Sequence, residues 1–297
     1  MAYGVESPIG FVGLGVMGGP MAGHLRSRYA NVWIWNRTPT KVGPWRELGC
    51  HVAESLEFLG EKCPVVFICV RGSEDVREVL ARLTADAPPG ALYVDHSTIS
   101  PSAAQAIARD LNNRGFRFVD APITGGSMGA QKGQLTIFCG GDRADFDEIK
   151  PVVAAYAKRA EYVGPSGAGQ MMKMANQIAV GGALFGLCES MAFAKKAGLD
   201  LAQTRELLAG GAAGSWAFDN YGPKILERDW TPGFSIDNQV KDFAYCEDAA
   251  KEIGASLPMT RVLHRLLREM QNEGHGDWTT AALFDKILGL RDEVCPE

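Results

Sequence analysis

The sequence lacks the features that mark secreted, membrane-spanning and nucleic-acid-binding proteins. It has no run of Lys and Arg, and 30 Lys+Arg against 35 Asp+Glu give a formal net charge of −5. A nucleic-acid surface needs clustered positive charge. The opening segment MAYGVESPIGFVGLGV has no basic stretch followed by a long apolar one, so we expect no signal peptide. A transmembrane helix needs about 20 apolar residues in a row, and no such run occurs. We therefore expect a soluble, cytoplasmic protein that binds neither nucleic acid nor a membrane.

Patterns of metal ligands and disulfides are missing as well. The seven cysteines include no C-x-x-C pair, and none has a histidine at metal-ligand spacing. We therefore expect reduced thiols and no metal site. His24, within an expected helix, and His96, at an expected strand end, are interpreted as packed structural residues, with an approach to the cofactor as the alternative for His96. What the chain has in excess is glycine, with 35 residues, and this predicts many turns in which the backbone approaches a ligand or another element.

The order of apolar runs and helical stretches predicts two domains. Short strands are expected at residues 9–14, 32–35, 65–70, 92–95, 117–119 and 135–139, with helices at 18–28, 75–83 and 101–113 between them. This alternation is typical of βαβ units and a mainly parallel sheet. From about residue 167 the pattern is helical, with helices expected at 171–196, 202–208, 238–253, 259–271 and 279–288. We predict an α/β domain over residues 1–165 and an all-helical domain over residues 166–297, joined by the long helix.

A glycine-rich loop follows the first expected strand and opens the first expected helix. Gly13 permits a tight turn, Gly15 lets a pyrophosphate approach the backbone, and Gly18 lets the helix pack closely on the strand. Phosphates then lie at the helix N-terminus, where free N–H groups favour negative charge. The alternative is a tight turn without a ligand. The predicted cofactor-binding loop comprises Gly13, Leu14, Gly15, Val16, Met17 and Gly18.

The end of the second expected strand distinguishes NADP from NAD. An acidic residue there would bind the ribose 2′-hydroxyl and repel a 2′-phosphate. The chain instead has Asn36, Arg37 and Thr38, followed by Lys41. Arg37 can pair with the phosphate and stack on adenine, and its neighbours can donate hydrogen bonds. The prediction is NADP, with NAD and a merely solvated basic turn as the alternatives.

Three later segments carry groups suited to catalysis. In the first, two glycines follow a hydroxyl residue at Thr124-Gly125-Gly126, an arrangement that exposes backbone N–H groups to a carboxylate. In the second, Lys173 lies one turn into an apolar helix and Asn176 lies three residues later, so the two share a face. The third is Lys241-Asp242 on a later helix.

The chain resembles the β-hydroxyacid dehydrogenase family in a series of motifs. In chain order these are GLGVMG, NRT, HSTIS, DAPITGG, GAGQMMKMANQ and KDF. The resemblance extends from about residue 9 to residue 288. It implies a Rossmann-type domain, a long connecting helix and a helical domain that helps to form a homodimer or homotetramer. It also implies an enzyme that interconverts a small β-hydroxyacid and its semialdehyde with NAD(P).

The resemblance also implies roles for single residues. Lys173 matches the catalytic residue, and Thr124, Gly125 and Gly126 match a substrate-binding Ser-Gly-Gly in which Thr replaces Ser. Further matches are Asn176 and Gln177 at the substrate, where Gln177 takes a position that is Asn in several members, and Val70, Thr98 and Lys241 at the cofactor. At Val70-Arg71 the family commonly has Leu-Pro, so the carry-over there is loose.

Lys173 also suits this chemistry without reference to the family. Negative charge grows on the oxygen of an aldehyde as it is reduced, and a positioned ammonium can donate a hydrogen bond and then a proton. A surface lysine without a catalytic role is the alternative. For the whole chain, the leading prediction is an NADPH-dependent reductase of succinic semialdehyde or glyoxylate type. An imine reductase on the same fold and a non-catalytic NADP-binding module are the other hypotheses.

Overall fold

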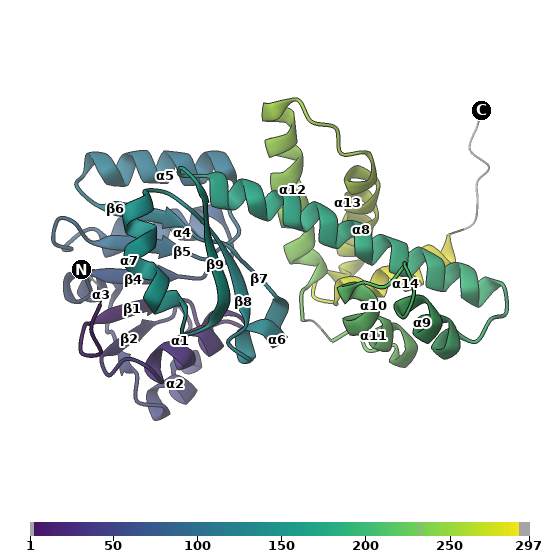
Figure 1. The fold of residues 1–297 in the computed structure, drawn as a ribbon, viewed down its shortest axis with the longest axis horizontal. Coiled ribbons are helices and arrows are strands. Elements are labelled where there is room, and N and C mark those ends of the chain that lie inside the picture. Colours follow the sequence, from purple (N-terminus) through teal and green to yellow (C-terminus); the bar gives the residue numbers. More distant parts are fainter. Residues whose placement is uncertain (1–2, 232, 291–297) are drawn as a thin grey trace. The chain divides into compact units, whose positions relative to one another are not determined.

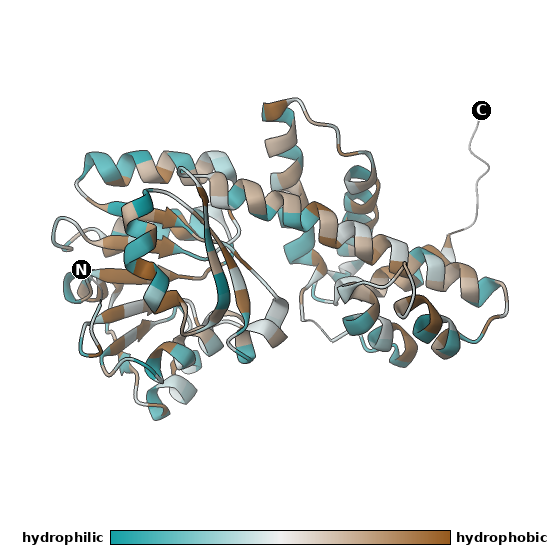
Figure 2. Ribbon diagram, in the orientation of Figure 1, coloured by the Kyte–Doolittle hydropathy of each residue, from teal (hydrophilic) through white to brown (hydrophobic). Residues whose placement is uncertain are grey.

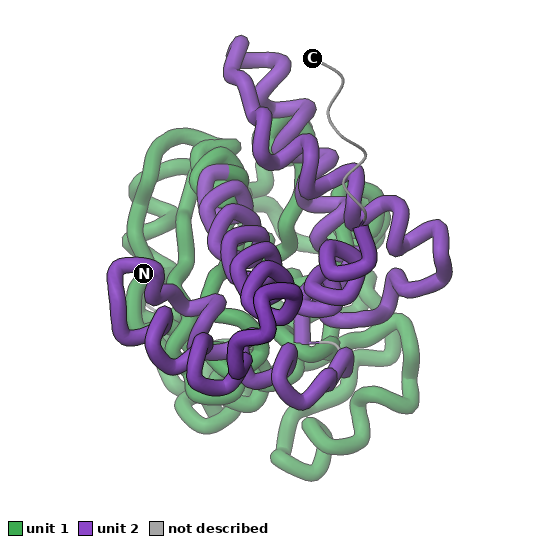
Figure 3. Tube along the Cα trace, turned by 90° about the vertical axis from the view of Figure 1, so that its right-hand side faces the viewer, with its two compact units in different colours: residues 1–174 green, residues 175–297 purple. Residues whose placement is uncertain are grey.

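A computed structural model describes residues 3–231 and 233–290, and the chain divides into two compact units, residues 1–174 and 175–297 (Figure 3). The first unit is α/β and the second is helical (Figure 1), which confirms the predicted fold class. The boundary between them falls inside α8 (Ala168–Lys196), so this helix supplies residues to both units.

The strands of the described residues form one sheet in the first unit. Along its main path the order is β3-β2-β1-β4-β5-β6-β8-β7, and β9 pairs with β8. The pairs from β3 through β6 are parallel, whereas β8 runs antiparallel to both β6 and β7. The strands are β1 (Ile9–Val12), β2 (Val32–Trp35), β3 (His51–Val52), β4 (Val65–Ile68), β5 (Leu92–Asp95), β6 (Arg117–Asp120), β7 (Ile123–Thr124), β8 (Leu135–Gly140) and β9 (Ala157–Gly164).

The central strands are apolar on both faces because helices cover both sides of the sheet. On β1, Phe11 belongs to one buried apolar cluster and Val12 to another. On β4, Phe67 and Ile68 divide between the same two clusters in the same way. Apolar residues accordingly run along these strands in Figure 2. Each strand thus contributes alternate side chains to two cores, as the two-residue period of a strand requires.

Local capping residues define several helices of this unit. Ser55, Ser100 and Asp142 accept hydrogen bonds from backbone N–H groups in the first turns of α3, α5 and α7. The helices are α1 (Gly18–Arg26), α2 (Gly43–Glu47), α3 (Leu56–Lys62), α4 (Ser73–Leu83), α5 (Pro101–Asn113), α6 (Gly126–Gln131) and α7 (Arg143–Val153), and a 3-10 turn η1 covers Pro39–Val42.

The second unit is built around α8 and the helices that follow it. Leu184, Leu187, Cys188 and Met191 of α8 are fully or almost fully buried. The other elements are α9 (Leu201–Ala209), α10 (Trp216–Asn220), α11 (Gly222–Glu227), α12 (Ile236–Ile253), α13 (Pro258–Met270), a π-helical turn η2 (Gln271–His275), a 3-10 turn η3 (Thr280–Ala282) and α14 (Leu283–Gly289). Among the described residues, α8 alone has the length and composition of a membrane span. The core helix of a protein without any membrane span can meet the same criteria.

Most expected elements occur close to their expected bounds, and the differences have local causes. The strands β3 and β7 contain two residues each, too few to form a pattern. β9 has the sequence AKRAEYVG, in which charged residues interrupt the apolar run because the strand contains several exposed positions. The six described cysteines carry free thiols, and Cys295 lies outside the described residues.

Candidate active site

The loop Gly13–Gly18 joins β1 to α1, and its three glycines differ in what surrounds them. Gly13 has a φ of 95°, and a Cβ there would lie 2.1 Å from the carbonyl oxygen of Cys69. At Gly18 a Cβ would lie 2.0 Å from the carbonyl oxygen of Gly13. At Gly15 a Cβ would meet nothing within 4 Å. Gly13 and Gly18 are therefore required by the protein itself, whereas the space at Gly15 is open to a ligand.

The first turn of α1 has the properties of a phosphate site. Met17 precedes the helix and makes no side-chain capping hydrogen bond, and the first turn contains no acidic residue. The loop is held from the next strand end, where Asn36 Oδ1 accepts the N–H of Leu14 at 2.9 Å and Asn36 Nδ2 donates to the Thr38 carbonyl at 2.9 Å. Uncapped N–H groups and the open space at Gly15 together fit a dinucleotide pyrophosphate.

A chain of contacts leads from this loop to the start of α8. Val70, which follows β4, lies against Gly13 and donates its N–H to Ser97 Oγ at 2.9 Å. The Ser97 carbonyl accepts a hydrogen bond from Gln170 Nε2 at 2.8 Å, and Gln170 Oε1 accepts the N–H of Ile99 at 3.2 Å. Gln170 therefore holds both sides of Thr98, the residue predicted to lie at the cofactor.

His96 lies beside this segment but is part of the core. It is 1% exposed and stacks on Phe67 with ring centroids 5.7 Å apart. Its Nδ1 donates to the Ala121 carbonyl at 2.7 Å, so Nε2 accepts from the Tyr156 hydroxyl at 2.8 Å. Burial lowers the pKa of His96 to about 4. His24 also has a structural contact, since Nε2 bonds the Ala130 carbonyl at 3.1 Å.

Lys173 is buried beside the predicted substrate loop. The residue is only 7% exposed, which contradicts the alternative of a surface lysine, and its Nζ donates to the Ile123 carbonyl at 2.9 Å. Ile123 immediately precedes Thr124, and the turn continues through Gly125 with a φ of 127° and Gly126 with a φ of 64°. These left-handed conformations are the ones glycine adopts freely, and they turn the backbone of the loop within a residue or two of the lysine's anchor.

Asp120 and Gln170 are site residues that we did not single out from the sequence. Asp120 ends β6, and its carboxylate accepts the N–H of Gly167 at 2.8 Å and that of Gln170 at 3.0 Å. It thereby fixes the start of the helix that carries Lys173. Burial raises the pKa of Asp120 to about 7, although these N–H groups oppose the rise. A carboxylate at the carboxyl end of a buried parallel strand was the signal available in the sequence.

The remaining predicted residues lie in the second unit, where they form a hydrogen-bonded group. Asn176 Nδ2 donates to Gln177 Oε1 at 2.9 Å, and Gln177 Nε2 donates to Asp242 Oδ2 at 2.7 Å. Lys241 Nζ lies 2.8 Å from Asp242 Oδ1 and 5.0 Å from the ring centre of Tyr245. Gln177 is 3% exposed and Asp242 is 2% exposed, so one buried carboxylate orients both the amide pair and the lysine.

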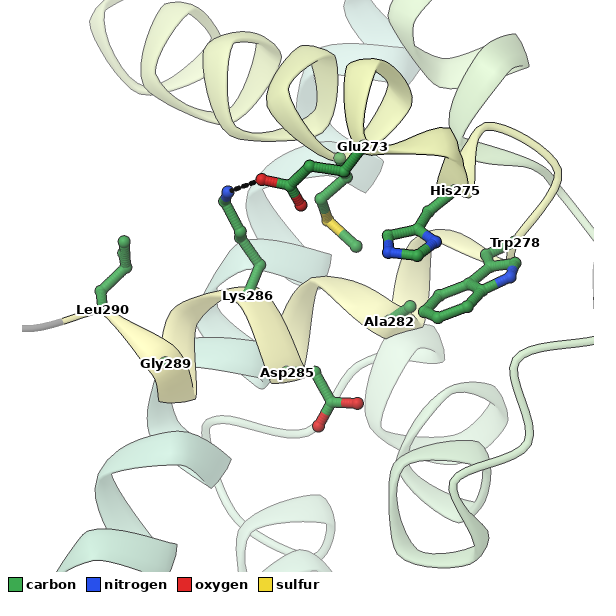
Figure 4. A pocket seen from close by; sticks show the side chains of 9 residues that line it. Glu273, His275, Trp278, Ala282, Asp285, Lys286, Gly289 and Leu290 are labelled. Atoms are coloured by element: carbon green, nitrogen blue, oxygen red, sulfur yellow. Dashed lines mark hydrogen bonds and ion pairs between the residues drawn. The ribbon is translucent and has the colours of Figure 1, made fainter.

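The second unit also contains a cavity of about 320 Å³, lined in part by Glu273, His275, Trp278 and Lys286 (Figure 4). Lys286 forms ion pairs with Glu273 at 2.6 Å and with Glu269 at 3.2 Å. His275 and Trp278 stack on each other with centroids 3.8 Å apart. None of the residues predicted for catalysis or cofactor binding lines this cavity.

Two models of known protein families together match almost all of the chain. The NAD binding domain of 6-phosphogluconate dehydrogenase matches residues 8–164, and the NAD-binding domain of NADP-dependent 3-hydroxyisobutyrate dehydrogenase matches residues 167–287. The 2-hydroxy-3-oxopropionate reductase of Escherichia coli (strain K12) is 34% identical over 94% of this chain and 96% of its own length. The chain belongs to the β-hydroxyacid dehydrogenase family. The family expected from the motifs is thereby confirmed, and the protein is an NAD(P)-dependent oxidoreductase.

Two further members support this assignment. The probable 3-hydroxyisobutyrate dehydrogenase-like 1, mitochondrial, of Arabidopsis thaliana is 38% identical over 94% of this chain and 84% of its own length. The crystal structure of 3-hydroxyisobutyrate dehydrogenase from Salmonella typhimurium superposes with a TM-score of 0.87 at 28% identity, covering 94% of this chain and 99% of that one. This β-hydroxyacid dehydrogenase therefore shares its fold with its relatives over nearly the whole chain.

Proposed function

We propose that this β-hydroxyacid dehydrogenase is an NADPH-dependent reductase of small carboxylated aldehydes, of the succinic semialdehyde or glyoxylate type, with Lys173 as general acid/base. The observation that carries the proposal is the burial of Lys173 with its Nζ 2.9 Å from the Ile123 carbonyl, next to the Thr124-Gly125-Gly126 turn. An ammonium group is thereby held beside the loop that has the features of a carboxylate site.

A bound nicotinamide would supply the hydride, and the chain's own residues would then have to handle one proton. As negative charge develops on the aldehyde oxygen, the Lys173 ammonium donates a hydrogen bond to it and then transfers a proton. In the reverse direction the neutral amine accepts the hydroxyl proton. The Ile123 carbonyl holds Nζ in place, and Asp120 fixes the first turn of the same helix. General-acid assistance of this kind contributes typically ~10²–10⁴-fold in rate.

Polar groups that suit the substrate's carboxylate occur both before and after Lys173 in the sequence. Thr124 offers a hydroxyl, and the glycine conformations at Gly125 and Gly126 turn backbone N–H groups out of the strand pattern. Asn176 offers an amide whose orientation is set by Gln177. Similarity to a 2-hydroxy-3-oxopropionate reductase supports a small molecule with both an aldehyde and a carboxylate as the substrate class.

The choice of NADPH rests on the turn after β2. Residues 36–38 contain no carboxylate to bind a ribose 2′-hydroxyl, and the Arg37 side chain is 76% exposed. An exposed guanidinium presents several N–H donors that suit a phosphate. We infer that Arg37 binds the 2′-phosphate, while Asn36 keeps its contact with Leu14.

A substrate panel tests the proposed function directly. NADPH oxidation is measured with glyoxylate, succinic semialdehyde, methylmalonate semialdehyde and tartronate semialdehyde, and each assay is repeated with NADH. We expect turnover with at least one of the four acids and a higher kcat/KM with NADPH. Binding of NADPH without oxidation by any of them would overturn the proposal in favour of a non-catalytic module.

Replacement of the proposed proton donor tests the mechanism. For Lys173→Ala we expect kcat to fall by about 10²-fold or more, because the developing charge on oxygen loses its proton donor, while the Kd for NADPH stays within twofold. Lys195→Ala is the matched control, because Lys195 is an exposed lysine near the end of the same helix. Near-normal kcat in Lys173→Ala would show that another group supplies the proton.

A further inference from the structure

The exposed Arg37 side chain forms an ion pair with a carboxylate. Its Nη1 lies 3.1 Å from Oδ1 of Asp75, whose side chain is 28% exposed. Asp75 belongs to the first turn of α4, which follows β4. Since β2 and β4 pair with opposite edges of β1, this ion pair spans the carboxyl end of the strand that leads into the Gly13–Gly18 loop. A carboxylate is therefore placed beside the guanidinium proposed to bind the 2′-phosphate.

The residues around Arg37 have their own places in this turn. Asn36 uses its side-chain oxygen for Leu14 and its amide for Thr38. Thr38 opens the turn η1, and Lys41 lies at the far end of that turn. Within this turn Arg37 is the basic residue next to Asn36, and Asp75 forms an ion pair with it.

We propose that Asp75 is a specificity-determining residue that restrains the preference for NADPH over NADH. This inference rests on the proposed role of Arg37 at the 2′-phosphate. A carboxylate and a phosphate that contact the same guanidinium repel each other, and they compete for the same N–H donors. NADH carries a neutral 2′-hydroxyl and experiences neither effect. Because the site is exposed and screened by salt, the effect is modest, about 3- to 10-fold in the KM for NADPH.

The test removes the charge and keeps the shape. For Asp75→Asn we expect the KM for NADPH to fall by about 3- to 10-fold at low salt, with the KM for NADH and both kcat values within twofold of wild type. The gain should shrink at high salt, because counterions screen the repulsion. Glu74→Gln is the matched control. Glu74 lies in the same helical turn, is 90% exposed and pairs at 4.0 Å with Arg77 instead of Arg37.

Several results would overturn the inference. An increased KM for NADPH in Asp75→Asn would mean that Asp75 orients Arg37 for the phosphate, and an equal gain in Glu74→Gln would mean that the effect is not specific to the ion pair. Arg37→Ala separates these failures from failure of the proposed cofactor. If Arg37→Ala leaves the KM for NADPH unchanged, the 2′-phosphate role of Arg37 is itself wrong. If it raises that KM while Asp75→Asn has no effect, only the role of Asp75 is wrong.

Discussion

At the scale of single residues, the glycines of the β1–α1 loop are constrained by different parts of the structure. Gly13 and Gly18 face backbone carbonyl oxygens of the protein at distances that admit no Cβ, whereas Gly15 faces open space. A methyl group at Gly15 should therefore be harmless to the free protein and harmful to a bound pyrophosphate. The same methyl group at Gly13 should disturb the fold itself.

This difference gives a test of the cofactor site that does not depend on the substrate. For Gly15→Ala we expect an unfolding midpoint close to that of wild type and a KM for NADPH at least tenfold higher, because the added methyl occupies the approach of the pyrophosphate. For Gly13→Ala we expect clear destabilisation, because its φ of 95° and the Cys69 carbonyl both disfavour a side chain. A normal KM in a folded Gly15→Ala protein would contradict the placement of the pyrophosphate.

At the scale of elements, Gly181 shows how the helices of the second unit approach each other. A Cβ on Gly181 of α8 would lie 2.6 Å from Cζ of Phe243 on α12 and 3.2 Å from Cδ2 of Leu263 on α13. Phe243 and Leu263 are fully buried. Glycine is disfavoured in the interior of a helix, so its presence within α8 needs a reason. The structure explains it by close helix packing.

Two substitutions in the same helix test that explanation. For Gly181→Ala we expect a loss of about 1–3 kcal/mol of unfolding free energy, because the methyl group overpacks the ring of Phe243. Gly186→Ala is the matched control, since a Cβ at Gly186 meets nothing within 4 Å. There we expect a gain of up to about 1 kcal/mol from helix propensity. The measurement is urea unfolding followed by circular dichroism. Equal effects of the two substitutions would exclude packing as the reason for Gly181.

The site residues that sequence patterns revealed and those they missed differ in the range of their contacts. Some site residues stand out because their immediate neighbours in the sequence reveal them. The loop glycines and Arg37 each follow an expected strand, and Lys173 is a charge within an apolar helix. Gln170 and Asp120 do not stand out in the sequence, because their hydrogen bonds join residues far apart along the chain. Gln170 bonds Ser97, 73 positions away, and Asp120 bonds Gly167 and Gln170, 47 and 50 positions away. Such pairings depend on the order of strands in the sheet, and no spacing within a single segment encodes that order.

At the scale of the whole molecule, the strand order brings residues distant in sequence to the carboxyl ends of the central strands. β2, β1, β4, β5 and β6 are consecutive in the parallel sheet. Arg37, the glycine loop, Val70 and His96 lie just after the first four of these strands, and Asp120 is the last residue of β6. Ligands of parallel α/β sheets bind at this edge. The alternation of strands and helices in the sequence was sufficient to predict a parallel sheet, whereas the antiparallel β8 and the short β7, which position Ile123 and Thr124, required the structure.

Burial of His96 in this sheet makes the stability of the protein depend on pH. The folded protein keeps His96 neutral down to about pH 4, while the unfolded chain binds a proton below the ordinary value of 6.5. Between these values the unfolded state holds more protons, so stability falls as the pH is lowered. Each pH unit in this range costs about 1.4 kcal/mol of unfolding free energy. His96 alone therefore lowers the unfolding free energy by roughly 3 kcal/mol between pH 6.5 and pH 4.

A single substitution separates His96 from all other titrating groups. Gln can donate to the Ala121 carbonyl and accept from the Tyr156 hydroxyl, as His96 does, but it does not titrate. For His96→Gln we therefore expect a smaller loss of unfolding free energy between pH 7.5 and pH 4.5 than for wild type, by about 2–3 kcal/mol. Urea unfolding of both proteins at a series of pH values measures the difference. Parallel stability curves would show that the imidazole is protonated in the folded core, which is incompatible with Nε2 accepting the Tyr156 hydrogen bond.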